Sequence, residues 1–127
     1  MLTYNNAFSG YSVDSLVNAK EFYTNKLGLD VKETPEGLQI NLQDGFTVFL
    51  YEKKDHVPAT FTVLNFEVDD IEESVDKLIS TDITFEYYAD FPFEQDERGI
   101  AWGKKVGMGP NIAWFKDPAG NTISLIG

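Results

Sequence analysis

The stretch Ala19-Lys20-Glu21-Phe22-Tyr23-Thr24-Asn25-Lys26-Leu27-Gly28-Leu29-Asp30-Val31 changes its pattern at Gly28. Before it, apolar residues recur every three or four positions, which is typical of one helix face. They are Leu16, Ala19, Tyr23 and Leu27, with Phe22 beside them. Asp14 or Ser15 can cap the start of this helix, and Gly28 can end it. The segment 29–33 then predicts a short strand.

Three further strands surround this helix in the first half of the chain. Segment 7–13 is short and apolar, and segment 38–42 alternates strictly between apolar and polar residues, as a half-buried strand does. Asp44-Gly45 is typical of a hairpin turn, and segment 46–51 predicts the strand after it. The predicted order is β-α-β-β-β.

The second half predicts the same order of elements. Segment 61–68 is rich in β-branched and aromatic residues, and Asp69-Asp70 can cap a helix with an apolar stripe at Ile71, Val75, Leu78 and Ile79. Asp117-Pro118-Ala119-Gly120 predicts a turn. Strands are expected at 83–88, near 98–102, at 111–116 and at 122–126.

The two halves match in register, which indicates an internal duplication. Ser12-Val13-Asp14 corresponds to Glu67-Val68-Asp69 at an offset of 55, and Asp44-Gly45 corresponds to Ala119-Gly120 at an offset of 75. The second half therefore carries about twenty extra residues, which fall in segment 88–110. We expect one α+β domain over 1–127, with a first module at about 1–54 and a second at about 60–127.

Composition excludes several classes of function. The 127 residues contain 10 Lys and Arg against 21 Asp and Glu, a net charge of −11, which disfavours nucleic acid and anionic membrane partners. No Cys is present, so disulfides and thiol chemistry are excluded. No apolar run is long enough to span a membrane, and segment 1–6 does not resemble a signal peptide. A cytoplasmic protein is the default expectation.

Three motifs make the chain resemble the vicinal-oxygen-chelate (VOC) superfamily of glyoxalase I, extradiol dioxygenases, and fosfomycin- and bleomycin-resistance proteins. Segment 19–31, with its helix ending at Gly28, is similar to that family's helix ending in "FY…LG", and Val68-Asp69-Asp70-Ile71 is similar to its step from strand to helix. Segment 112–121 resembles its terminal "DPdGN" turn. The resemblance implies two tandem βαβββ modules whose eight strands form an open, cup-like barrel with helices outside.

In metal-using relatives the first and last strands of each module point one ligand into the cup. Counting from the motifs places these positions on Phe8, Phe49, Val63 and Ser124. Phe and Val offer no lone pair, and a lone Ser hydroxyl is a poor ligand for a divalent cation. We therefore expect no metal ligands and no cofactor, although the resemblance makes a metal-dependent lyase or dioxygenase the alternative.

The same positions predict an apolar cavity for a small molecule. Strand alternation adds Gly10, Ser12, Asn65, Glu67 and Thr122 to the inward faces. The expected ligand-binding residues are Phe8, Gly10, Phe49, Val63, Asn65, Glu67, Trp102 and Ser124. The alternative is that these side chains fill the barrel themselves.

Two titratable residues are catalytic candidates. His56, the only His, could act as a general acid or base, but a solvent-exposed loop His beside Asp55 is the simpler interpretation. Glu67 could act as a base on the cup wall, or could be an ordinary wall carboxylate. A metal-free isomerase or lyase would use one of them.

The extra segment 88–110 interleaves Phe91, Phe93 and Trp102 with acidic residues. This pattern fits a lid over the cup, a dimer contact, or a surface excursion anchored by its aromatic side chains. The leading functional hypothesis is a protein that binds a small, cationic or aromatic molecule without metal catalysis, as a homodimer. An interaction module without any ligand is a further alternative.

Overall fold

Strand β1 (Ser9–Val13) begins the first of two units, Met1–Pro58, in the computed structural model, which describes residues 1–127. Helix α1 (Leu16–Glu21) continues as the π-helical turn η1 (Phe22–Lys26). Strands β2 (Asp30–Thr34), β3 (Gly37–Asn41) and β4 (Thr47–Glu52) follow, with the 3-10 turn η2 (Gln43–Gly45) between the last two. The sheet order is β1-β4-β3-β2, and only the β1–β4 pair is parallel.

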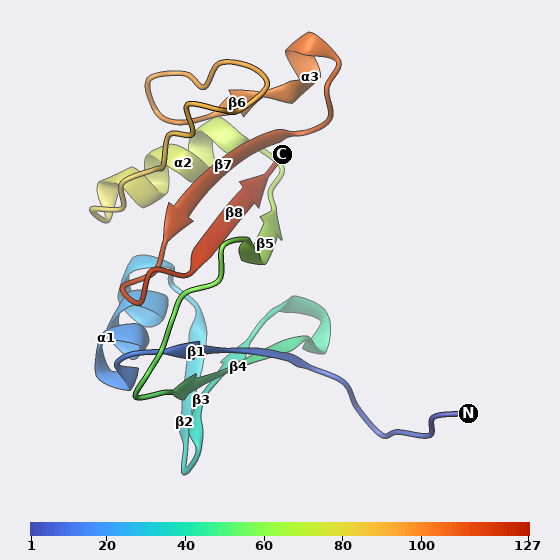
Figure 1. The fold of residues 1–127 in the computed structure, drawn as a ribbon, viewed down its shortest axis with the longest axis vertical. Helices are drawn as coiled ribbons and strands as arrows, with labels where there is room; N and C mark the ends of the chain where they lie inside the picture. Colours follow the sequence, from blue (N-terminus) through green and yellow to red (C-terminus); the bar gives the residue numbers. More distant parts are fainter. The chain divides into compact units, whose positions relative to one another are not determined.

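The second unit, Ala59–Gly127, repeats this plan (Figure 1). Strand β5 (Thr62–Glu67) leads into α2 (Ile71–Ser80). After a long connection come β6 (Ala101–Trp102), the short helix α3 (Gly103–Val106), β7 (Asn111–Lys116) and β8 (Thr122–Ile126). The order is β5-β8-β7-β6 with a parallel β5–β8 pair, so both units are βαβββ modules.

Both helices begin where the sequence predicts. The Ser15 hydroxyl accepts a hydrogen bond from the backbone N–H of Asn18 at 3.2 Å, and the Asp70 carboxylate accepts one from Glu73 N–H at 3.1 Å. Each satisfies a donor that the first helical turn leaves without a backbone partner. Gly28 has φ +70°, the left-handed conformation expected just after a helix. None of the helices has the length and apolar character needed to cross a membrane.

In each unit the helix covers one face of the sheet. Helix α1 packs against β3 and β4, and α2 packs against β7 and β8. The side chains on the helix-covered faces are buried and apolar. They are Leu38, Ile40, Val48 and Leu50 in the first unit and Ala113, Phe115, Ile123 and Leu125 in the second. Alternation along the strands leaves the remaining side chains on a helix-free face.

The pairing registers agree with the predicted duplication. Gly10 lies opposite Phe49 in the β1–β4 pair, and Asn65 lies opposite Ser124 in the β5–β8 pair. The offset of 55 converts Gly10 to Asn65, and the offset of 75 converts Phe49 to Ser124. The two modules therefore correspond residue by residue at their central strand pairs.

The strand predicted at 83–88 is wrong. Only Phe85 forms a bridge there, to Phe115 of β7. Asp82 enters the segment at φ +66°, and farther along the side-chain amide of Gln95 occupies the backbone groups of Glu86 and Tyr88. A side chain thus replaces the neighbouring strand that the segment would need. The strand predicted near 98–102 is shortened to β6.

Candidate ligand-binding faces

The helix-free face of the first unit carries aromatic side chains. Phe49 and Tyr51 follow one another on this face of β4, with ring centroids 6.5 Å apart and ring planes 17° apart. Gly10 and Ser12 of β1 lie directly opposite them. Phe8 immediately precedes β1 and is 64% exposed. The sheet register thus brings Gly10 and Phe49 together.

His56 belongs to this same unit and contacts the helix-free face. Its Nδ1 lies 2.7 Å from the Ser12 hydroxyl, and its side chain is half-buried. The neighbouring Asp55 carboxylate pairs instead with Lys53 at 3.5 Å. His56 is therefore fixed on the sheet by a hydrogen bond rather than extended into solvent beside Asp55.

The helix-free face of the second unit is more polar at the corresponding place. The hydroxyl of Ser124, a fully buried residue, donates a hydrogen bond to Asn65 Oδ1 at 2.5 Å. Trp114 of β7 lies opposite Ser124 in the β7–β8 pair and shares its face. Glu67, two residues beyond Asn65, shares this face and is exposed. Asn65, Glu67 and Ser124 therefore share one face of the sheet.

Val63 lies at an irregularity of the sheet. The β5–β8 register shifts between Thr62 and Leu64, so Val63 is the extra residue of a β-bulge. A bulge interrupts the alternation of faces. The simple count along the strand therefore does not assign Val63 to a face.

Within the second unit, Trp102 lies on the other face of the sheet from Asn65 and Ser124. It pairs with Asn111, which shares the helix-covered face of β7 with Ala113 and Phe115. Its indole N–H donates to Asp96 Oδ2 at 3.0 Å, and Lys105 Nζ lies 4.2 Å from the ring centroid. The sheet separates Trp102 from Ser124, which occupies the opposite face.

Other aromatic residues of the extra segment extend the helix-free face of the second unit. Phe91 packs edge-on against Trp114 at 4.9 Å between ring centroids, and Tyr88 does so at 5.3 Å. Phe93 packs against Phe91 at 4.8 Å. Burial, and then the charge of Glu86, raise the pKa of Tyr88, so its phenol remains neutral at physiological pH. The sequence does not reveal this layer, because the facing of Trp114 depends on the register of the β7–β8 hairpin.

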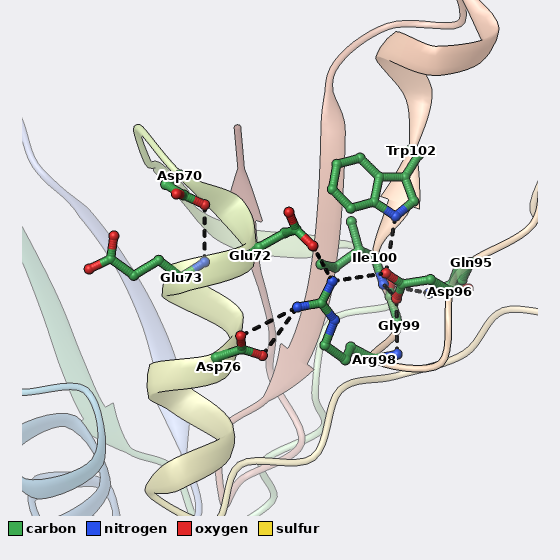
Figure 2. Close-up of polar contacts among 10 residues, drawn as sticks. All are labelled: Asp70, Glu72, Glu73, Asp76, Gln95, Asp96, Arg98, Gly99, Ile100 and Trp102. Atoms are coloured by element: carbon green, nitrogen blue, oxygen red, sulfur yellow. Dashed lines mark hydrogen bonds and ion pairs between the residues drawn. The ribbon is translucent and has the colours of Figure 1, made fainter.

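On the helix-covered side, Arg98 joins the extra segment to α2 (Figure 2). Its guanidinium contacts the carboxylates of Glu72 at 2.5 Å and Asp76 at 3.3 Å, both on α2. It also lies 3.5 Å from Asp96. The hydrogen bond to Glu72, and then the other two carboxylates, raise the pKa of Arg98 against the effect of burial. This group of charges fastens one end of the segment.

Asp96 organises the turn before β6. Partial burial would raise the pKa of its carboxyl, but hydrogen bonds from Ile100 N–H, the Trp102 indole and Arg98 N–H outweigh burial, together with the Arg98 charge. The net effect holds the pKa of Asp96 below its ordinary value. The ionised form is therefore the one that the fold stabilises.

The residues at the four metal-ligand positions do not fit a metal ion. Phe8, Phe49 and Val63 have no donor atoms, and the Ser124 hydroxyl is already hydrogen-bonded to Asn65. His, Asp and Glu side chains form no group of three or more that could hold a cation. The donor set thus disagrees with the metal chemistry that the resemblance implies.

Comparison with known protein families agrees with the resemblance seen in the sequence. The family model described as the Glyoxalase/Bleomycin resistance protein/Dioxygenase superfamily matches residues 8–125. No curated protein matches significantly.

Several solved structures share the fold. TnmS3, an antibiotic binding protein from Streptomyces sp. CB03234, is 19% identical with a TM-score of 0.63, and each chain covers 98% of the other. A glyoxalase family protein from Enterococcus faecalis is 19% identical with a TM-score of 0.66 over 97% of each chain. The fosfomycin resistance protein FosX from Listeria monocytogenes is 11% identical with a TM-score of 0.67, over 98% of this chain and 93% of its own.

Proposed function

Because the chain belongs to the Glyoxalase/Bleomycin resistance protein/Dioxygenase superfamily, we propose that it binds a small, positively charged aromatic molecule and does so without metal catalysis. Each unit offers its helix-free sheet face to such a ligand. TnmS3, an antibiotic binding protein with the same fold, supports small-molecule binding as a function of this fold. At 19% identity the ligand of TnmS3 does not transfer to this chain, so the support must come from the side chains of this chain.

The observation that supports the proposal most is the pair of stacked rings on β4. Phe49 is half-buried and Tyr51 is 42% exposed, so both rings present surface that a flat guest can cover. Covering an aromatic ring removes a large apolar area from water and adds favourable ring-ring geometry. Gly10, directly opposite Phe49, adds no side chain that would compete for this surface.

Charge supports a cationic guest over an anionic one. The chain carries a net charge of −11, which raises the local concentration of cations near its surface. Glu67 supplies an exposed carboxylate on the polar helix-free face of the second unit. A cation over a Tyr or Trp ring gains about 0.5–2 kcal/mol from the ring quadrupole.

A titration tests this proposal directly. The protein is titrated with proflavine, a flat aromatic cation, and with a panel of cationic glycopeptide drugs, and binding is followed by calorimetry and thermal shift. We expect saturable binding that Tyr51→Leu weakens and that Val17→Ser, a change of an exposed residue on α1, leaves unaltered. Absence of heat and of any thermal shift across the panel, or equal binding by both variants, would contradict the proposal.

A metal-free isomerase or lyase is the second candidate, and the hydrogen bond between Ser12 and His56 favours it. A half-buried imidazole held 2.7 Å from a hydroxyl has the geometry of a general acid or base. Glu67 is the other candidate base. If this function is correct, His56→Ala and Glu67→Gln both abolish turnover of a carbonyl substrate. Unchanged turnover in either variant removes that residue from the reaction.

The proposal places the protein in the cytoplasm as a homodimer. The absence of Cys is compatible with a reducing compartment. Light scattering after size exclusion distinguishes a dimer of about twice 14.3 kDa from a monomer. A single species of monomer mass at micromolar concentration would contradict the dimer.

A further inference from the structure

The extra segment of the second unit passes from one side of the sheet to the other. We name residues 86–98 the strap. At its start, Glu86 N–H donates to the carbonyl of Trp114 at 2.8 Å, and the rings of Tyr88 and Phe91 pack on Trp114. At its end, Arg98 contacts α2 on the helix-covered side. The strap thus connects the helix-free face to the helix.

Gln95 closes the strap at its base. Its side-chain N–H₂ donates to the carbonyls of Glu86 at 2.8 Å and Gly99 at 2.7 Å. Its Oε1 accepts the backbone N–H of Tyr88 at 2.8 Å. One carboxamide therefore satisfies three backbone groups from both ends of the strap. This bonding defines where Tyr88 leaves the sheet.

Arg98 fixes the same base to the rest of the unit. Its guanidinium reaches Glu72 and Asp76 one turn apart on α2, and its charge also faces Asp96. Asp96 in turn accepts the indole N–H of Trp102 in β6 (Figure 2). A planar guanidinium can meet several carboxylates at once, which a Lys ammonium does less well. The strap is therefore attached to both α2 and β6.

We propose that Gln95 and Arg98 are positioning residues for ligand recognition: they hold the strap so that Tyr88 and Phe91, with Trp114, form an aromatic wall that selects flat aromatic cations. This inference rests on the proposed function. The wall borders the Asn65–Ser124 pair, because Trp114 lies opposite Ser124. A flat guest would contact ring surface and a polar pair on the same face.

The charge of the strap fits the same class of guest. Five carboxylates and one guanidinium give residues 86–98 a net charge of −4. Glu86, beside the wall, is paired with Lys116 at 3.3 Å, whereas Asp90 and Glu94 are exposed. Aromatic rings beside carboxylates favour a delocalised cation through both stacking and cation–π attraction. A small aliphatic cation gains the cation–π attraction but not the stacking.

The test combines two variants with a matched control. Gln95→Met keeps the side-chain volume and removes all three hydrogen bonds of the carboxamide. Arg98→Lys keeps the positive charge but removes the planar guanidinium that contacts several carboxylates at once. Lys77→Met breaks the exposed Lys77–Glu73 ion pair on α2 and touches neither the strap nor the wall. Wall geometry is read from nuclear Overhauser contacts between the Phe91 and Trp114 rings. Binding is read from the dissociation constants of proflavine and of tetraethylammonium.

We expect Gln95→Met to remove the contacts between the Phe91 and Trp114 rings and to weaken proflavine binding about tenfold, with tetraethylammonium little changed. Arg98→Lys should give a smaller loss in the same direction, and Lys77→Met none. Intact ring contacts in a folded Gln95→Met protein would overturn the positioning role. Lost contacts with unchanged selectivity would overturn the role of the wall in recognition.

The two proposals fail in different ways. If the unaltered protein binds neither probe, both the proposed function and the recognition role of the wall fail. The contacts between the Phe91 and Trp114 rings still decide, independently of binding, whether Gln95 and Arg98 hold the strap. If Gln95→Met does not fold, the ring contacts and the probe selectivity of Arg98→Lys are compared with those of Lys77→Met instead. Equal selectivity of Arg98→Lys and Lys77→Met would then overturn the inference.

Discussion

The Ser124 hydroxyl donates a hydrogen bond to the Asn65 carboxamide oxygen across the parallel pair of β8 and β5. Ser124 is fully buried, whereas Asn65 is exposed, so the pair links the interior of the second unit to its surface. The polar atom at this family position thus has a protein partner. Its environment suits a neutral hydroxyl and not a charge.

Substitutions of Ser124 distinguish a site for a neutral hydroxyl from a site for a charged carboxylate. Ser124→Val removes one hydrogen bond and leaves an exposed carboxamide that water can satisfy, so we expect a loss of about 0.5–1.5 kcal/mol of unfolding free energy. Ser124→Glu buries a carboxylate without a cation and should cost several kcal/mol. Urea denaturation at pH 7 measures both. Equal stability of the two variants would mean that water reaches the site.

Two glycines allow neighbouring strands to approach closely. A Cβ built on Gly37 would lie 2.1 Å from the Leu50 carbonyl oxygen, and one on Gly10 would lie 2.9 Å from that of Phe49. We expect Gly37→Ala to destabilise the protein more than Gly10→Ala, which should cost about 1–3 kcal/mol. Ser9→Ala, at an exposed residue of β1, is the control. Thermal denaturation measures the order, and the reverse order would contradict these close contacts.

Asp96 makes stability depend on pH in the acid range. Its folded-state pKa lies below the ordinary value of 3.8, so its contribution is fully present above that value and is lost as the pH falls through the folded-state pKa. The stability difference between the unaltered protein and Asp96→Asn should therefore be largest near pH 6 and shrink below pH about 4. Urea denaturation from pH 3 to 7 measures this difference. Asp90→Asn serves as the exposed control, and a difference independent of pH would refute the assignment.

The turn between β7 and β8 depends on one carboxylate. Asp117 Oδ1 accepts the N–H groups of Ala119 and Asn121 at 2.9 Å each, and Oδ2 accepts the Asn121 side-chain amide at 3.1 Å. Asp117→Ala leaves these buried donors without this acceptor and should cost about 2–4 kcal/mol. Asp117→Asn keeps one acceptor oxygen, so its stability should lie between that of the unaltered protein and that of Asp117→Ala. Chemical denaturation measures the order, and identical stability of both variants would contradict it.

Much of the fold could be predicted because its signals are local. The Ser15 and Asp70 caps, the Gly28 helix end and the 117–120 turn each depend on a few neighbouring residues, and the structure has all of them. The matching registers of Gly10–Phe49 and Asn65–Ser124 follow from the repeat in the sequence. These features need no knowledge of distant contacts.

The remaining features depend on contacts between distant residues. Segment 83–88 has strand-like composition, but the Gln95 side chain takes the backbone groups that a strand would use. The face of Trp102 is set by the β6–β7 register, and the bulge at Val63 by the β5–β8 register. The aromatic wall needs Trp114, Tyr88 and Phe91 from two separate segments. None of these pairings leaves a local sequence signal.

The agreement of the two central strand pairs has an evolutionary consequence. The halves share a backbone frame at these strand pairs but differ in the side chains that they place there, Gly10 and Phe49 against Asn65 and Ser124, and in the length of one segment. An ancestor made of two identical halves would have presented the same chemistry twice. The first half presents an aromatic pair at this place and the second presents a polar pair beside aromatic rings, so exchanging those residue pairs between the halves tests what each surface binds.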